Sequence, residues 1–129
     1  MPPLVLLVED HALLRVILSR AIAELGCRVI AAGNGDEALR LLTSGVVPDL
    51  VLSDLRMPGE ISGMDLARWL RARHPDLPVL LQSGYADVDT AGFTLLRKPF
   101  TGEQLTAALV ALLPQLAARS NAQSSATTS

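Results

Sequence analysis

Short runs of consecutive apolar residues recur along the chain, separated by segments in which apolar residues are spaced for one face of a helix. The runs occupy residues 4–8, 28–32, 50–53, 78–82 and 93–96. Strands that are apolar along their whole length are typical of a parallel sheet covered by helices on both faces. We therefore interpret each run as a buried strand.

Four segments between and after these runs have the pattern of amphipathic helices. They occupy residues 14–25, 37–42, 63–73 and the segment that follows Thr101. Asn34 can cap the start of the second helix, and Thr101 with Gln104 forms a capping-box pattern at the start of the last. The alternation predicts an α/β fold with a doubly wound, five-stranded parallel sheet.

The connection between the fourth and fifth runs departs from this alternation because it is short. Only residues 83–92 are available, whereas a crossover between parallel strands normally takes about a dozen residues and contains a helix. The segment includes Gly84, Asp87, Asp89 and Gly92. We expect a loop with at most one helical turn in place of a fourth helix.

The composition narrows the class of protein. The length of 129 residues predicts one domain. The net charge of −2 and the lack of a run of basic side chains argue against nucleic acid as a partner, because nucleic acid requires an electropositive surface. The single cysteine, Cys27, and the lack of a signal-peptide pattern predict a cytoplasmic protein. The longest uncharged stretch, residues 104–118, is interrupted by Pro114 and is too short for a membrane span.

Polar side chains gather where the predicted strands end. These groups are Glu9 and Asp10 after the first run, Asp54 after the third, Ser83 after the fourth and Lys98 after the fifth. The carboxyl ends of parallel strands share one edge of the sheet, so the groups converge there. Three carboxylates packed together favour a bound cation, and an oxygen-only ligand set suits Mg²⁺. Asp54 can then stay ionised and attack a phosphoryl group whose oxygens meet Lys98 and Ser83.

The sequences at these strand ends resemble those of receiver domains of two-component response regulators. The matching segments are Leu-Val-Glu-Asp, Leu-Ser-Asp-Leu-Arg-Met-Pro-Gly, Gln-Ser-Gly-Tyr-Ala and Arg-Lys-Pro-Phe, in this order. The likeness spans residues 3–118, and the four motifs are specific in combination. The resemblance implies a flavodoxin-like receiver fold and Asp54 as the phosphoacceptor. It implies Mg²⁺ ligands from Asp10, Asp54 and the backbone carbonyl of Arg56, with Glu9 as the accompanying acid.

The resemblance also assigns the other side of the site. Ser83 would supply the hydroxyl and Lys98 the cation that contact the phosphoryl group, and the Lys98–Pro99 peptide bond would be cis. Ser83 has a plainer interpretation as a turn residue before Gly84. The chain would not be a conventional enzyme, because it would catalyse only its own phosphotransfer and autodephosphorylation at Asp54.

Other acids and a histidine near the site have plainer interpretations. Asp49 borders the same apolar run as Asp54 but, at roughly 3.3 Å per strand residue, lies about 16 Å away at the opposite edge, where a solvated loop carboxylate is expected. Glu9 and Asp10 could instead cap the first helix. His11, in the first helical turn, is expected to be exposed.

Two features depart from the usual receiver pattern. Receivers usually place an aromatic residue three positions before the conserved lysine, and here that position is Leu95, so either Tyr85 or Phe93 can replace it as the switch residue. The Ser-Gly-Tyr-Ala segment resembles a receiver subgroup with a reduced fourth helix that is associated with HWE-class histidine kinases, although Ala86 differs from its motif. We expect residues 84–92 to be mobile without phosphate and ordered by it.

These features predict a receiver domain over residues 1–118 and a disordered polar tail over residues 119–129. We expect no DNA-binding module in this tail, because it is too short to form one. Such a stand-alone receiver would take a phosphoryl group from a histidine kinase or a phosphotransfer protein and signal to an unknown downstream protein. One alternative is a phosphorylation-independent interaction module. Another is a small Mg²⁺ phosphohydrolase, which is disfavoured because Arg56 stands two residues after Asp54, where a second acid is needed.

Overall fold

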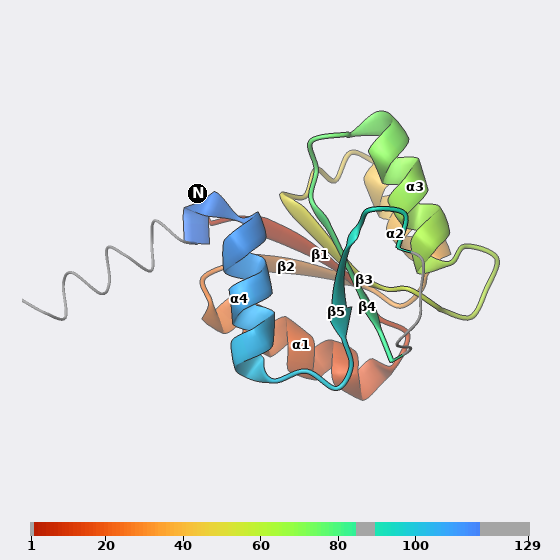
Figure 1. The fold of residues 1–129 in the computed structure, drawn as a ribbon. Helices are drawn as coiled ribbons and strands as arrows, with labels where there is room; N and C mark the ends of the chain where they lie inside the picture. Colours follow the sequence, from red (N-terminus) through yellow and green to blue (C-terminus); the bar gives the residue numbers. More distant parts are fainter. Residues whose placement is uncertain (1, 85–89, 117–129) are drawn as a thin grey trace, which may run out of the picture.

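A five-stranded parallel sheet forms the centre of the molecule, with the strands in the order β2-β1-β3-β4-β5 (Figure 1). The computed structural model describes residues 2–84 and 90–116. The strands are β1 (Leu4–Val8), β2 (Arg28–Ala32), β3 (Leu50–Asp54), β4 (Val79–Ser83) and β5 (Thr94–Arg97). The five predicted strands are confirmed, and β4 and β5 begin one residue later than the apolar runs suggested.

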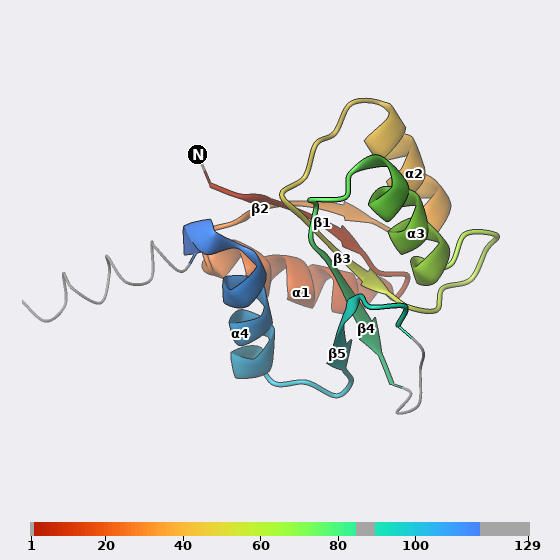
Figure 2. The same cartoon turned by 45° about the horizontal axis from the view of Figure 1, so that its top comes forward.

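Two helices cover each face of the sheet, as Figure 2 shows from a second direction. The helices are α1 (Ala12–Glu24), α2 (Gly35–Thr43), α3 (Gly63–Arg73) and α4 (Gly102–Leu112). The predicted caps are confirmed. Asn34 Oδ1 accepts the N–H of Glu37 at 2.8 Å, and Thr101 and Gln104 form a reciprocal capping box with bonds of 3.1 and 2.8 Å. These caps satisfy backbone N–H groups that a helix start otherwise leaves without partners.

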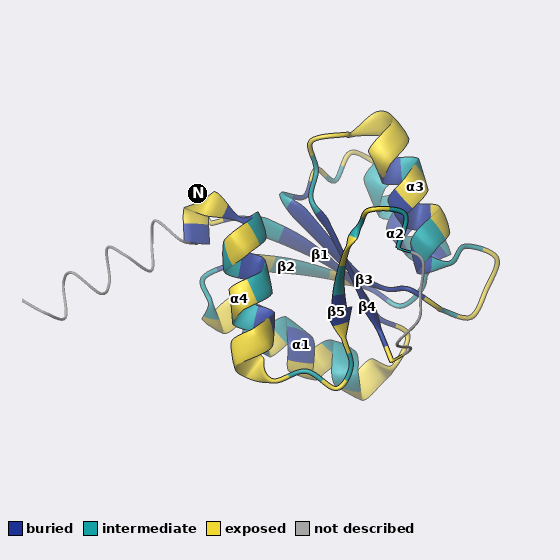
Figure 3. Cartoon of the chain, viewed as in Figure 1, coloured by how far each residue is buried: buried dark blue, intermediate teal, exposed yellow. Residues whose placement is uncertain are grey.

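The sheet separates two apolar cores. Leu18 and Ile22 of α1 pack with Leu105 and Leu109 of α4 against one face. Residues of α2 and α3 pack against the other face, among them Ala38, Leu66, Ala67 and Leu70. The central strands β1, β3 and β4 are almost entirely buried, whereas the edge strands β2 and β5 are partly exposed (Figure 3). Burial on both faces explains why the central strands carry apolar residues at consecutive rather than at alternate positions.

The outward side of α1 carries apolar residues that are exposed to solvent. Ile17 lies within the predicted amphipathic segment, residues 14–25, but it is 53% exposed. Leu13 and Val16 share its exposed side and are 65% and 55% exposed. The helix packs on the sheet through Leu18 and Ile22, and the 100° step between neighbouring helical residues turns Ile17 away from that contact.

The connection between β4 and β5 contains no helix in its described residues, which are 84 and 90–93. This agrees with the predicted reduction of the fourth helix. Residues 85–89 lie outside the described part of the chain, and so do Tyr85 and most of the segment predicted to become ordered on phosphorylation. The predicted tail, residues 119–129, lies outside it as well.

An arginine of α3 lies over the start of β5. Arg71 Nη2 donates a hydrogen bond of 2.7 Å to the carbonyl oxygen of Ala91, and the guanidinium carbon lies 3.6 Å from the centroid of the Phe93 ring. Ala91 and Gly92 both have positive φ, at 50° and 86°. The Arg71 side chain therefore contacts the polypeptide at the point where the short connection turns into β5.

Among the residues that the structure describes, no helix is both long and apolar enough to cross a bilayer. Leu113 and Leu116, which follow α4, are 2% and 3% exposed and belong to the core beneath α1 and α4. The described part of the apolar stretch near the carboxyl end, residues 104–116, therefore contributes leucines to the domain core.

Candidate functional site

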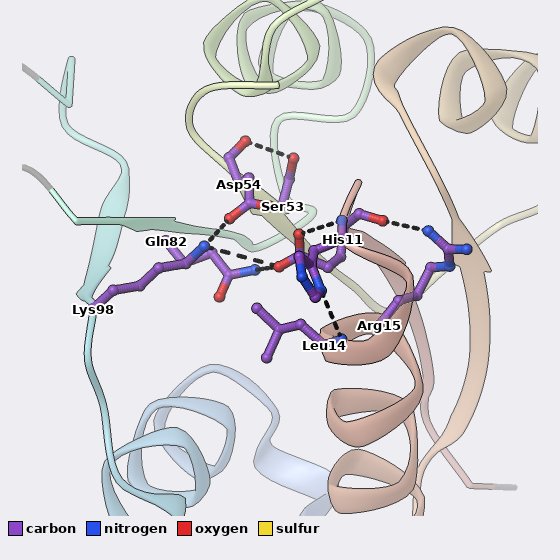
Figure 4. Close-up of polar contacts among 8 residues, drawn as sticks. His11, Leu14, Arg15, Ser53, Asp54, Gln82 and Lys98 are labelled. Carbon is purple, nitrogen blue, oxygen red and sulfur yellow. Dashed lines mark hydrogen bonds and ion pairs between the residues drawn. The ribbon is translucent and has the colours of Figure 1, made fainter. Parts of the chain in front are cut away.

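Three ionisable side chains meet at the carboxyl ends of the strands. Asp54 is the last residue of β3, Glu9 follows β1 and Lys98 follows β5. Lys98 Nζ lies 2.6 Å from Asp54 Oδ1 and 3.8 Å from Glu9 Oε1 (Figure 4). The Asp54 and Glu9 side chains are 5% and 1% exposed, whereas Lys98 is 32% exposed. The structure thus brings together the predicted acceptor, its accompanying acid and the predicted phosphate-binding lysine.

The backbone around Asp54 is held by a close approach of α3. Gly63, the first residue of α3, donates its N–H to the carbonyl oxygen of Leu55 at 3.0 Å. A Cβ atom on residue 63 would lie 1.7 Å from the carbonyl oxygen of Asp54, so only glycine fits there. This contact fixes the end of β3 and with it the position of the Asp54 carboxylate.

Glu9 is held through its backbone and its side chain. Arg15 Nη1 donates a 2.8 Å hydrogen bond to the Glu9 carbonyl oxygen, and Glu9 Oε2 accepts the N–H of His11 at 3.1 Å. Burial, reinforced by a hydrogen bond with Asp54, raises the pKa of the Glu9 carboxyl to about 8. Without a cation Glu9 therefore holds a proton at neutral pH, which relieves the repulsion between it and Asp54.

The start of α1 is capped by His11, whose Nδ1 accepts the N–H of Leu14 at 3.3 Å. His11 is exposed, as expected, but the alternative that Glu9 and Asp10 cap this helix is wrong. Glu9 and Asp10 lie in the turn between β1 and α1, before the helix begins. Their carboxylates lie near Asp54 at the end of the sheet.

The donor set suits a hard divalent cation. One carboxylate oxygen each from Glu9, Asp10 and Asp54 lies within 4.8 Å of the other two. Asp54 Oδ2 is buried and accepts no hydrogen bond from any residue in the described part of the chain. Clustered carboxylates with an open oxygen are the arrangement that Mg²⁺ occupies while keeping several water ligands. Arg56, whose backbone carbonyl was predicted as a ligand, follows this group at an exposed position.

The remaining predicted residues lie on β4 and β5. Ser83, the last residue of β4, is 5% exposed, and its carbonyl oxygen accepts the N–H of Lys98 at 2.8 Å. Leu95 and Phe93 both pack against the core beneath α2 and α3. Phe93, which is the described one of the two residues predicted to replace Leu95 as the switch residue, also lies under the Arg71 side chain of α3.

Asp49 is at the opposite edge of the sheet from the site, as predicted, but it is not a solvated loop carboxylate. Its Oδ2 accepts the N–H of Leu4 at 2.7 Å, and Asp49 is half-buried. The bond joins the segment before β3 to the first residue of β1. Asp49 therefore anchors these two strands to each other, because its side chain accepts a backbone N–H of β1 and its own N–H donates to the carbonyl oxygen of Leu4 at 2.7 Å.

Sequence reasoning missed Gln82. This residue of β4 is 1% exposed, and its Nε2 lies 3.4 Å from Glu9 Oε1. The signal that could have found it is an amide in an otherwise apolar strand, directly before Ser83. Arg15 was also missed, because its contact with the Glu9 carbonyl depends on how α1 turns back over β1.

Comparison with known sequences places this geometry in a family. Residues 5–110 match the sequence model of the response regulator receiver domain. The DNA-binding transcriptional regulator NtrC of Salmonella typhimurium is 37% identical over 111 residues, which cover 81% of this chain and 23% of that protein. The regulatory protein AtoC of Escherichia coli is 36% identical over 108 residues, covering 78% of this chain and 23% of that protein. The chain thus spans less than a quarter of the length of these relatives.

Solved structures share the fold. A response regulator receiver protein from Sinorhizobium medicae has a TM-score of 0.82 and 31% sequence identity, with 89% of this chain and 97% of that chain covered. The response regulator TrrA of Thermotoga maritima, solved in complex with Mg(2+)-BeF, has a TM-score of 0.78 and 31% identity, covering 88% and 100% of the two chains. Sequence and fold agree, and this chain belongs to the family of response regulator receiver domains.

Proposed function

We propose that this receiver domain accepts a phosphoryl group on Asp54 from a phosphohistidine of a histidine kinase or phosphotransfer protein, with Mg²⁺, and signals through protein contacts. The observation that supports it best is the state of the Asp54 carboxylate. Oδ1 is paired with Lys98 Nζ at 2.6 Å, while Oδ2 has no donor among the described residues. A buried carboxylate with one oxygen oriented and the other open can act as a nucleophile toward phosphorus.

The transfer requires little beyond alignment and charge neutralisation. An Asp54 oxygen forms a bond to phosphorus as the phosphorus–nitrogen bond of the phosphohistidine breaks, and the electron pair returns to the imidazole nitrogen. Lys98 and the Ser83 hydroxyl contact the phosphoryl oxygens. Attack of water on the same phosphorus later releases phosphate and restores the carboxylate.

The cation would be held by Asp10, Asp54 and the backbone carbonyl of Arg56, with Glu9 as the accompanying acid. When bound, Mg²⁺ supplies positive charge to the phosphoryl oxygens. The clustering of three carboxylate oxygens within 4.8 Å of one another supports this assignment. Glu9 must release its proton for the three acids to carry their full charge, because its pKa is raised to about 8.

The direct test measures the intact mass of the protein after incubation with Mg²⁺ and a small-molecule phosphodonor such as acetyl phosphate. We expect one phosphoryl adduct in the wild type and none in Asp54→Asn. Asp49→Asn is the matched control, because Asp49 borders the same strand, and an asparagine oxygen can still accept the N–H of Leu4. This variant should carry the adduct at the wild-type level.

The alternatives give different outcomes in the same assay. No adduct with several donors would favour a phosphorylation-independent interaction module. Release of many phosphates per molecule would favour a phosphohydrolase. If the adduct forms, profiling of phosphotransfer from a set of purified histidine kinases identifies the physiological donor by the fastest transfer to Asp54.

A further inference from the structure

Gln82 is a buried amide at the point where the metal-binding acids meet β4. Its Cα pairs in register with Asp54, so both side chains lie in the same row of the sheet. Val79, Leu80 and Leu81 precede it in β4 and are fully apolar. Figure 4 shows the side chain beside Lys98 and Asp54. A leucine would fill this position of a buried strand, so packing alone does not account for the amide.

The hydrogen-bonding of Gln82 points to Glu9. Its Nε2 donates to Glu9 Oε1 across 3.4 Å, and its own Oε1 is buried without a donor from any described residue. A buried acceptor that lacks a donor is unfavourable, so the amide is incompletely satisfied by the fold itself. Among the described residues, the side-chain hydrogen bond that the amide makes is with an acid of the proposed Mg²⁺ site.

The two carboxylate oxygens of Glu9 have different hydrogen-bond donors. Oε2 is held by the N–H of His11 at 3.1 Å, and Oε1 faces Gln82. Lys98 Nζ, at 3.8 Å from Oε1, is beyond hydrogen-bond distance and is bonded to Asp54 instead. A neutral amide can orient a carboxylate without cancelling the charge that a cation needs, which an ammonium group in its place would do.

We propose that Gln82 is a positioning residue for the Mg²⁺ site, holding the Glu9 carboxylate beside Asp10 and Asp54 so that the cation meets oxygens that are already placed. The inference rests on the proposed function, since it assumes that Mg²⁺ binds there. It adds a residue of β4, the strand that ends in Ser83, to a site otherwise built from residues at the ends of β1 and β3.

The test compares Mg²⁺ affinity by isothermal titration calorimetry in the full chain. Gln82→Met removes the amide and keeps the length of the side chain, and Leu80→Met is the matched control on the same strand and the same face. We expect the Mg²⁺ dissociation constant to rise about 10-fold in Gln82→Met and to change by less than about 2-fold in Leu80→Met. In a Glu9→Gln background, Gln82→Met should change it by less than about 2-fold, because the partner is gone.

A second readout uses the wild-type protein and does not require the variant to fold. The side-chain amide NMR signals of Gln82 should shift during Mg²⁺ titration with the same midpoint as the backbone N–H of Asp54. Wild-type affinity in Gln82→Met, an equal loss with and without the Glu9 carboxylate, or unmoved amide signals would each overturn the inference. In those cases Mg²⁺ binding and the Asp54 adduct of the wild type would still stand, so the two proposals fail separately.

Discussion

The Glu9 carboxyl has the most altered acid–base chemistry in the described part of the site. It is 1% exposed, contacts Asp54 and has a pKa raised to about 8. Burial is the main cause, because the low dielectric of the interior disfavours the ionised form. The neighbouring Lys98 opposes the shift but is bonded more closely to Asp54.

This raised pKa predicts a pH-dependent stability. In the unfolded chain Glu9 titrates near its ordinary pKa of 4.5, so between that value and about 8 the folded protein binds more protons than the unfolded one. The free energy of unfolding therefore falls as pH rises through this window, by on the order of a few kcal/mol. Urea denaturation without divalent cations, at about pH 5 and about pH 8.5, measures the loss.

Glu9→Gln provides the control for this prediction, because it removes the titration and keeps the shape. Its unfolding free energy should depend less on pH over the same window. Saturating Mg²⁺ should restore much of the stability of the wild type at high pH, since a ligand of the folded state stabilises it. Parallel pH profiles for the wild type and Glu9→Gln would contradict the assignment.

At the scale of elements, a side chain of α3 holds the described end of the short connection between β4 and β5. The Arg71 guanidinium lies over the Phe93 ring and donates a hydrogen bond to the carbonyl oxygen of Ala91. Ala91 adopts a positive φ of 50°, which costs a residue other than glycine about 1 kcal/mol. The contact with Arg71 offsets this cost and fixes the start of β5, the strand that leads to Lys98.

We therefore expect Arg71→Ala to lower the free energy of unfolding by about 1–2 kcal/mol, through loss of a cation–π contact and a hydrogen bond. Arg68→Ala, in an exposed arginine of the same helix, should change it by less than about 0.5 kcal/mol. Hydrogen exchange should also accelerate at the N–H of Phe93, which is bonded to Thr90 at 2.9 Å. Equal effects of the two substitutions would show that Arg71 does not hold this connection.

At the scale of the whole molecule, the domain core extends beyond α4. Leu113 and Leu116 are buried with the side chains of α1 and α4, so the residues that follow the last helix contribute to the fold. The family match ends at residue 110, before these leucines. The structural domain is thus longer than the segment that sequence comparison defines.

A truncation series tests this boundary. A chain ending at residue 118 should unfold with the same free energy as the full chain and still take a phosphoryl group on Asp54. A chain ending at residue 112 should lose about 3–5 kcal/mol, because two buried leucine side chains are removed. Equal thermal midpoints for the two truncated chains would place the end of the folded domain at α4.

Much of the fold and site was predictable because it depends on local pattern and on one topological rule. Continuous apolar runs encode strands buried on both faces, and Asn34 and Thr101 encode helix starts. Since parallel strands end at one edge, Glu9, Asp54 and Lys98 could be brought together from sequence alone. The roles proposed for Ser83, Phe93 and Leu95 remain predictions.

Tertiary structure decided what depends on strand register and on the approach of one backbone to another. The hydrogen bond of Gln82 with Glu9 spans 73 positions of sequence and follows from the order of β1, β3 and β4 in the sheet. The stacking of Arg71 on Phe93 requires α3 to lie beside the segment that leads into β5. Local periodicity reports whether a residue is buried but not which distant residue it meets. The sequence by itself therefore determined the elements and the edge of the sheet where the candidate site lies, and only the packed fold determined the partners of each side chain there.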